Sequence, residues 1–261
     1  MVKLFAINTG WQTLALFGFD KPKVRVPSPA FLIEHDAGLV LVDSGFHPDC
    51  LREPEYRVGW QAKVITFEAA GESVDIAARL TSLGWDPADI RYLVNTHLHA
   101  DHAGGNAFIP ASATHVLHAR EWAAACSPRD IVRNFYVPAD YAEVRPRLAV
   151  ETDHDLFGDG AVTLIETPGH TPGHMSVRVT LEGQDVVITG DACYRSEWLD
   201  TGESSPIVGY DKAAEAASLL KLRGLREEGA AILVGHDTDV WRSLPEAPRP
   251  ITHHDVGAAA T

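Results

Sequence analysis

The chain has 261 residues, of which 45% are hydrophobic, and it carries a formal net charge of −14 at pH 7. This size and composition are ordinary for a globular protein with a substantial core. The acidic balance, without a dense Lys/Arg cluster, argues against nucleic acid as a partner.

The cysteines and the hydropathy of the sequence indicate the cellular compartment in which the protein is expected. The three cysteines are widely spaced and odd in number, which favours free thiols over a disulfide framework. No run approaches the ~18 apolar residues of a transmembrane helix, so no membrane partner is expected. The first eight residues form a short apolar run with one Lys and no small-residue cleavage site, which is typical of a first strand and not of a signal peptide. We therefore expect a cytoplasmic protein.

The first half of the chain alternates between strand and helix patterns. Residues 30–45 contain two β-rich runs around an Asp/Gly turn, which predicts a hairpin that ends at Asp43. A carboxylate in this place is either a simple turn former or the group that orients a ligand histidine. Residues 48–70 show no clear period and are typical of a lid or binding loop. Residues 72–84 have one apolar helical face, and residues 90–94 read as a buried strand.

That strand leads into the segment 96–102, Thr-His-Leu-His-Ala-Asp-His, which is followed by an Ala-Gly-Gly turn. His97, His99, Asp101 and His102 are four metal-capable side chains that the end of one strand delivers to one point. Neutral imidazole and carboxylate together suit zinc and similar first-row ions. The alternative is a polar loop that is merely rich in histidine, and the regular spacing argues against it.

The second half repeats this plan. Residues 162–166 form a strand pattern that leads into Thr167–His174, and a hairpin over 176–189 ends in Gly190 and Asp191. An amphipathic helix over 213–225 and a strand over 230–234 follow, and the strand ends in Gly235 and His236. Residues 129–147 have no clear assignment.

Two halves that each run hairpin, helix and strand predict an α/β fold, an αββα sandwich with the metal site at the shared strand ends. No Ser/Gly-rich linker separates the halves, so we expect one domain over residues 1–261. Three prolines from Pro245 onward and a closing Gly-Ala-Ala-Ala-Thr predict a loose tail over about 246–261.

These motifs resemble those of the metallo-β-lactamase superfamily. Its HxHxDH motif is matched by residues 97–102, its later histidine within residues 167–170, its bridging aspartate at Gly190-Asp191 and its last histidine at Gly235-His236. The resemblance implies two zinc ions. One would be held by His97, His99 and His170, the other by Asp101, His102 and His236, with Asp191 bridging the two. His174 is a rival to His170 and is interpreted as a supporting residue.

A narrower resemblance is to the N-acyl homoserine lactone lactonases, the quorum-quenching branch of this superfamily. It depends on residues 99–106, on residues 167–176 and on Asp191-Ala-Cys-Tyr194. In that branch a tyrosine three residues after the bridging aspartate points into the site, and Tyr194 matches it. The alternative for Tyr194 is an aromatic side chain that only packs behind a strand.

The resemblance implies a lactone-opening mechanism that needs no organic cofactor. A hydroxide held between the two metal ions would attack the lactone carbonyl. One zinc and the Tyr194 hydroxyl would stabilise the oxyanion, a contribution of ~3–4 kcal/mol per donor. Asp101 would relay a proton to the leaving alkoxide. The expected partner is a small-molecule lactone, and its acyl chain has candidate contacts with Trp11, Phe17, Phe19, Trp60, Phe67 and Trp198.

Several alternatives stay open within this chemistry. The nearest are hydrolysis of another lactone, such as pyridoxolactone or γ-butyrolactone, or of a thioester. The acidic last fifty residues argue against a glutathione thioesterase, and the overall charge argues against a nuclease. A diiron electron-transfer protein, which would have Glu near His99, and a non-catalytic metal-binding module are more distant. A homodimer through the aromatic residues of 11–19 also stays open.

Overall fold

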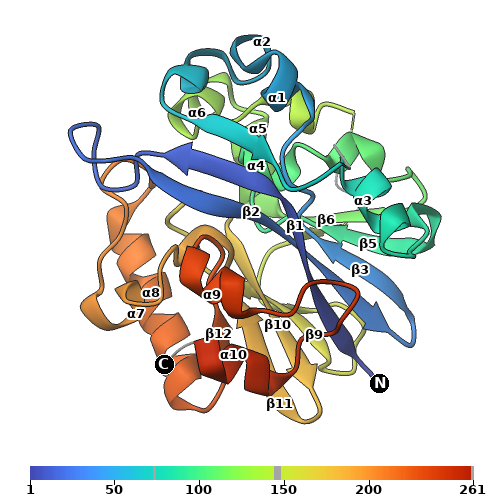
Figure 1. The fold of residues 1–261 in the computed structure, drawn as a ribbon. Helices are drawn as coiled ribbons and strands as arrows, with labels where there is room; N and C mark the ends of the chain where they lie inside the picture. The colour runs from blue at the N-terminus through green and yellow to red at the C-terminus, as the bar shows by residue number, and fades with distance from the viewer. Residues whose placement is uncertain (73–74, 144–147, 260–261) are drawn as a thin grey trace.

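The computed structural model describes residues 1–72, 75–143 and 148–259, and two β-sheets form its centre (Figure 1). The larger sheet has seven strands in the order β4 (Thr66–Ala69), β1 (Lys3–Leu14), β2 (Val24–His35), β3 (Gly38–Val42), β5 (Ile90–Val94), β6 (Thr114–His118) and β7 (Leu148–Val150). The smaller sheet has five strands in the order β12 (Ala231–Leu233), β11 (Gln184–Ile188), β10 (Met175–Leu181), β9 (Val162–Glu166) and β8 (His154–Asp155).

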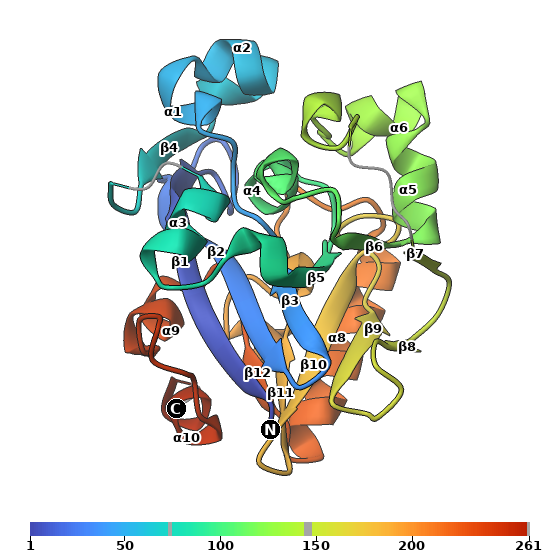
Figure 2. The ribbon, with the colours of Figure 1, turned by 90° about the vertical axis from the view of Figure 1, so that its right-hand side faces the viewer.

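Helices flank the two sheets and lie over their ends (Figures 1 and 2). They are α1 (Asp49–Arg52), α2 (Pro54–Val58), α3 (Ile76–Ser82), α4 (Ala100–Ala103), α5 (Ala119–Ala125), α6 (Pro128–Arg133), α7 (Trp198–Thr201), α8 (Lys212–Glu227), α9 (Thr238–Ser243) and α10 (His253–Ala259). No helix of the described residues has the length and apolar character needed to cross a bilayer. The predicted αββα sandwich is confirmed.

The core follows the period-2 pattern of the strands. In β3, Val40 and Val42 point into the core between the sheets, whereas Leu41 points to the opposite face and packs with Ile76 and Leu80 of α3. Helix α8 contributes buried leucines to the core on the side of the smaller sheet. Because both faces of the sheet are covered at this central strand, β3 is apolar throughout.

The repeated plan of the two halves is also present. Strand β3 pairs with β5 in parallel, after the hairpin β2–β3 and helix α3. Strand β11 pairs with β12 in parallel, after the hairpin β10–β11 and helix α8. Parallel neighbours end at the same edge of their sheet, so the segments after β3, β5, β11 and β12 gather at one end of the sandwich.

Three expectations need adjustment. Residues 48–70 are not irregular throughout, because they form α1, α2, a 3-10 turn at Gly59–Lys63 and the edge strand β4. The unassigned stretch contains α6 and a 3-10 turn at Pro138–Asp140, and its residues 144–147 lie outside the described part. The tail expected to be loose packs against the fold: Ile251 donates its N–H to the carbonyl of Leu4 at 2.7 Å, and Val256 is fully buried. Residues 260–261 lie outside the described part.

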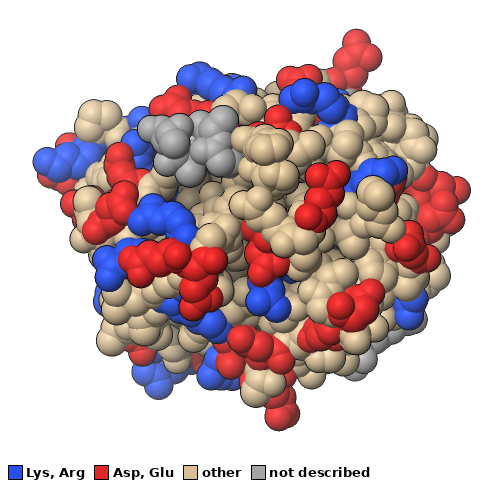
Figure 3. All heavy atoms as spheres, turned by 90° about the horizontal axis from the view of Figure 1, so that it is seen from below, with Lys and Arg blue, Asp and Glu red and all other residues tan. Residues whose placement is uncertain are grey.

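The surface agrees with the acidic composition. On the face drawn in Figure 3, Lys and Arg side chains lie among Asp and Glu and form no continuous basic area within the described residues. Such a face lacks the electrostatic footprint that a polyanionic partner requires.

Candidate metal centre

Seven of the predicted side chains converge where the strands of the two sheets end. They fall into two groups whose ligand atoms lie within 4.8 Å of one another. The groups are His97, His99, His170 and Asp191, and Asp101, His102 and His236. All are buried except the half-buried His99 and Asp101.

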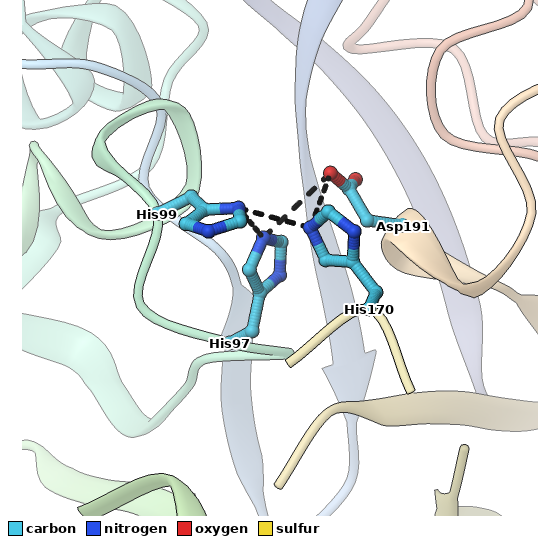
Figure 4. Close-up of side chains that lie close together, drawn as sticks. All are labelled: His97, His99, His170 and Asp191. Atoms are coloured by element: carbon cyan, nitrogen blue, oxygen red, sulfur yellow. Dashed lines mark hydrogen bonds and ion pairs between the residues drawn. The ribbon is translucent and has the colours of Figure 1, made fainter. Parts of the chain in front are cut away.

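The first group gathers three imidazoles around one carboxylate oxygen (Figure 4). His99 Nδ1 lies 3.0 Å from His97 Nε2 and 2.9 Å from His170 Nε2. Asp191 Oδ2 lies 3.6 Å from His97 Nε2 and 3.2 Å from His170 Nε2. The three nitrogens and the oxygen therefore face one small volume.

The second group uses the other oxygen of the same aspartate. Asp191 Oδ1 lies 3.0 Å from His102 Nε2 and 3.1 Å from His236 Nε2. Asp101 Oδ2 lies 3.4 Å from each of these two nitrogens. Asp191 thus faces both groups, one oxygen to each, as a bridging ligand must.

Asp43 orients two of the histidines. Its Oδ2 accepts a hydrogen bond from His102 Nδ1 at 2.7 Å and from Thr96 Oγ1 at 2.8 Å, and its Oδ1 accepts from the Thr96 N–H at 2.8 Å. Because the Thr96 hydroxyl donates to Asp43, it accepts from His97 Nδ1 at 3.0 Å. Both imidazoles therefore carry their proton on Nδ1 and present Nε2 as a lone pair. Of the two roles considered for Asp43, the geometry matches the orienting one.

Backbone carbonyls orient two more histidines. His236 Nδ1 donates to the carbonyl of Pro27 at 2.8 Å, and His99 Nε2 donates to the carbonyl of Asn134 at 2.7 Å. His236 therefore presents Nε2 to its group, whereas His99 presents Nδ1. A carbonyl partner is typical of a histidine held ready for a metal ion.

His174 supports the site from outside. Its Nε2 accepts the backbone N–H of Asp191 at 3.0 Å, and its Nδ1 therefore donates to Thr167 Oγ1 at 2.9 Å. Both ring nitrogens are occupied, so His174 lacks a free ligand atom and instead positions the loop that carries Asp191. His170, whose Nε2 faces the first group, is the better ligand candidate.

The donor set fits a pair of cations. In the first group the lone pairs of His97 Nε2 and His99 Nδ1 point at each other with no proton between them, an arrangement that a cation would relieve. Burial lowers the pKa of both histidines, for His99 to about 3, so they stay neutral as metal ligands require.

The second group also favours positive charge. Burial by itself would lower the pKa of His102 and His236, but the nearby carboxylates of Asp191 and Asp101 raise the pKa of both histidines. Burial also opposes ionisation of Asp191, yet the surrounding histidines hold the pKa of that carboxyl well below its usual range. One buried and one half-buried carboxylate among five imidazoles thus favour cations in the site.

Tyr194 lies in the wall of the pocket over these groups. Its ring stacks on His236, with centroids 5.1 Å apart, and contacts His170 edge-on at 5.6 Å. Trp198 packs behind it at 5.5 Å. Burial and the nearby Asp191 raise the pKa of Tyr194 well above its usual value, so its hydroxyl remains a donor.

Two neighbouring cavities lie beside the groups. A small pocket of about 80 Å³ contains Tyr194 and Asp191 in its lining, and an apolar hollow of about 780 Å³ lies next to it. The two cavities share Leu14, Gln61, Ile65, Phe135 and Val208.

The aromatic candidates divide between these cavities and other places. Phe17, Phe19 and Trp60 line the apolar hollow, and Phe67 lines the small pocket. Trp11 instead lines a separate cavity between α3 and the C-terminal segment. Trp198 is fully buried and does not line the hollow; it packs behind Tyr194 and against Phe17, whose ring centroid lies 6.1 Å away.

Two polar residues of the site have no motif and were not predicted. Gln12 of β1 is buried, lines the small pocket and donates from Nε2 to Asp101 Oδ2 at 2.6 Å. Glu121 of α5 is fully buried and accepts the N–H of Leu98, which lies between two of the candidate ligands. In the sequence, Gln12 and Glu121 could have been recognised only as polar residues within an otherwise apolar face of a strand or helix.

A paired His/Asp cluster at the strand ends of an αββα sandwich defines a protein with a two-metal site. Residues 24–236 match the model of the metallo-beta-lactamase superfamily, and the chain belongs to this family.

Its relatives include named lactonases. It is 34% identical over 235 residues to the N-acyl homoserine lactonase AttM of Azorhizobium caulinodans, an alignment that covers 86% of this chain and 87% of AttM. It is 26% identical over 230 residues to the N-acyl homoserine lactonase AiiA of Bacillus thuringiensis subsp. kurstaki, with 87% and 88% covered. The solved structure of an N-acyl homoserine lactone hydrolase with N-hexanoyl-L-homoserine at its catalytic metal centre superposes with a TM-score of 0.82, at 26% identity, over 95% of this chain and 98% of that one.

Proposed function

We propose that this protein is a metal-dependent hydrolase that opens the lactone ring of N-acyl homoserine lactones. The observation that carries the proposal is Asp191, which turns one carboxylate oxygen to each ligand group at the floor of a pocket that lies next to an apolar hollow. A polar reaction centre beside a long apolar cavity suits a substrate with a lactone head and an acyl tail. The lactonases among its relatives support the same substrate class.

The metal ligands are part of the proposal. One divalent ion would be held by His97, His99 and His170, the other by Asp101, His102 and His236, and Asp191 would bridge them. Nitrogen-rich ligands with two carboxylates and no thiolate favour zinc. When bound, such ions polarise a carbonyl group and make water a competent nucleophile near neutral pH.

Tyr194 and Asp101 are the residues we assign to the reaction itself. Hydrolysis adds water across the ring ester: the carbonyl carbon gains a hydroxyl group, and the ring oxygen gains a proton as its bond to that carbon breaks. The Tyr194 hydroxyl, which stays protonated, donates to the carbonyl oxygen as negative charge develops there. Asp101 contacts Gln12 and both histidines of its group through Oδ2, and its Oδ1 is the oxygen we assign to carrying the proton.

The apolar hollow is the proposed site of the acyl chain. Its walls come from the β1–β2 connection with Phe17 and Phe19, from the 3-10 turn with Trp60 and from the loop that carries Val208. Each methylene group transferred from water into such walls contributes about 0.8 kcal/mol. This corresponds to an increase in kcat/KM of up to ~4-fold per methylene until the hollow is filled.

The test is a proton-release assay on protein loaded with zinc. Its substrates are N-acyl homoserine lactones with short and long chains, γ-butyrolactone, pyridoxolactone, a thioester and a β-lactam. We expect turnover of the acyl homoserine lactones, with kcat/KM rising with chain length, and little turnover of the last two. If only pyridoxolactone or γ-butyrolactone is hydrolysed, the protein is still a lactonase, but the proposal that its substrates are N-acyl homoserine lactones is wrong. If no ester is hydrolysed, the remaining interpretation is a non-catalytic metal-binding module.

A pair of variants tests the place of the acyl chain. Val208→Trp would fill the junction between pocket and hollow, so kcat/KM should fall for long chains and stay nearly unchanged for short ones. Val132→Trp on α6, where the side chain is 74% exposed, is the matched control and should change neither. If Val208→Trp lowers kcat/KM equally for all acyl-chain lengths, the acyl chain does not bind in the hollow.

We also propose a cytoplasmic location, which the three free cysteines support. The homodimer stays a prediction.

A further inference from the structure

We propose that Glu121 is a positioning residue that fixes the distance between the two loops that carry His97, His99 and His170. It does so by accepting a backbone N–H from each loop on its two carboxylate oxygens. The inference rests on the proposed metal sites but not on the proposed substrate.

The contacts of Glu121 reach both loops at once. Oε1 accepts the N–H of Leu98 at 3.0 Å, and Oε2 accepts the N–H of Gly173 at 2.9 Å. The Tyr136 hydroxyl donates to Oε1 at 2.7 Å. The Glu121 side chain has 0% exposure, and no Lys, Arg or His of the described residues forms an ion pair with it.

These contacts fall between ligands. Leu98 stands between His97 and His99, and Gly173 follows His170 by three residues. The two loops follow strands of different sheets, β5 of the larger and β9 of the smaller, so no ladder of hydrogen bonds runs between them. One backbone bond, from the Met175 N–H to the Thr96 carbonyl at 2.9 Å, joins them before His97, and the Glu121 carboxylate adds a second link after His97.

The close packing of the second loop supports the same role. A Cβ atom at Gly173 would lie 2.3 Å from the backbone nitrogen of Glu121, so only glycine permits this approach of the loop to α5. Burial raises the pKa of the Glu121 carboxyl, yet all three of its partners are donors and only the ionised form satisfies them. The residue is thus a buried acceptor surrounded by donors.

Glu121→Gln separates this role from a general contribution to folding. The amide nitrogen would face at least one of the three donors, which releases one loop while the side-chain volume is kept. Loss of such a supporting partner typically lowers metal affinity ~10–100-fold. We expect that loss for the ion held by His97, His99 and His170 alone, and less than ~3-fold for the other ion. Stepwise chelator competition measures both affinities, and the visible spectrum of the cobalt-loaded protein reports the changed geometry.

Tyr136→Phe is the matched control. It removes a donor from the same carboxylate but keeps the ring and its contact with His99, whose ring centroid lies 5.9 Å away, so both metal affinities should stay within ~3-fold of those of the unchanged protein. Equal weakening of both ions in Glu121→Gln, or unchanged affinities, would overturn the proposal. None of these measurements uses lactone hydrolysis. A wrong substrate proposal can therefore be distinguished from a wrong role for Glu121.

A measurement on the unchanged protein covers the case in which the variant does not fold. Glu121 holds the two N–H groups whether or not metal is bound. Amide hydrogen exchange at Leu98 and Gly173 should therefore be slow in the metal-free protein and similar after zinc is added. Fast exchange at either amide in the metal-free protein, with protection only after zinc, would show that the metal and not Glu121 joins the loops.

Discussion

Asp43→Asn tests whether one carboxylate orients ligands of both proposed metal ions. Asp43 has a φ of +57°, a left-handed conformation that Asn tolerates nearly as well as Asp, so backbone strain does not confuse the result. Its oxygens accept three hydrogen bonds, from His102 Nδ1 and from the hydroxyl and N–H of Thr96. An amide has only one oxygen, so at least one donor is left facing an NH2 group.

The expected cost follows from these three bonds. One buried donor without an acceptor costs about 1–3 kcal/mol of the free energy of unfolding. If the amide nitrogen faces His102, the imidazole is driven to the tautomer with its proton on Nε2, which cannot bind a metal ion. The same amide nitrogen would face the Thr96 hydroxyl, which shares Oδ2 of Asp43 with His102, so the partner of His97 is disturbed as well. We therefore expect metal affinity to fall ~10–100-fold at both sites, unlike the selective loss expected for Glu121→Gln.

Two assays check this prediction. Urea unfolding of the metal-free protein gives the free energy of unfolding, and chelator competition gives the two metal affinities. Asp75→Asn is the control, because Asp75 caps α3 by accepting the N–H of Ala78 at 2.8 Å and Asn caps helices equally well. If Asp43→Asn retained both metal affinities within ~3-fold, the role of Asp43 in orienting the ligands would be wrong.

Three further predictions concern the reaction, the thiols and the backbone. Tyr194→Phe should lower kcat on an acyl homoserine lactone ~10²–10³-fold with two metal ions still bound, because it removes one donor to the oxyanion; unchanged kcat would remove Tyr194 from the mechanism. In the folded protein at pH 8 only the exposed Cys126 should react with a thiol reagent, because burial raises the pKa of the Cys50 and Cys193 thiols to about 12. Mass spectrometry should count one label before unfolding and three after it. Gly105→Ala should destabilise the protein by about 1–3 kcal/mol, because its Cβ would lie 2.2 Å from a backbone oxygen, whereas Gly224→Ala in α8 meets no atom within 4 Å and should stabilise it by about 0.4–1 kcal/mol. Urea unfolding of the two glycine variants would contradict this reasoning if their order were reversed.

The clustering of the proposed ligands was predictable because each of them follows an apolar strand within a few residues. The strand β5 ends at Val94 and β12 at Leu233, and His97 and His236 each follow three residues later. Strand period, strand end and residue type are all local in sequence, so they can be recognised without knowing the fold. The parallel pairing of β3 with β5 and of β11 with β12 then follows from the repeated hairpin, helix and strand plan.

The supporting residues were harder to predict because their partners are distant in sequence. Gln12 contacts Asp101 across 89 residues, and Glu121 contacts Gly173 across 52. Neither has a motif, and a Gln in a strand or a Glu in the first turn of a helix is ordinary on a solvated face. Only the packing of the two sheets makes these positions interior.

The walls of the pocket escape sequence analysis for a different physical reason. Part of these walls comes from the segments 48–70 and 129–143, whose short helices have too few residues to show a period. The two segments are tied to each other across the pocket: Arg57 pairs with Asp140, and Gln61 Nε2 donates to the carbonyl of Phe135 at 3.0 Å. The floor of the site is thus built by strand ends that the fold requires, whereas the walls depend on a few contacts between loops. Substitutions in the walls should therefore change which acyl chain is accepted, while the metal ligands and their supporting carboxylates tolerate little change.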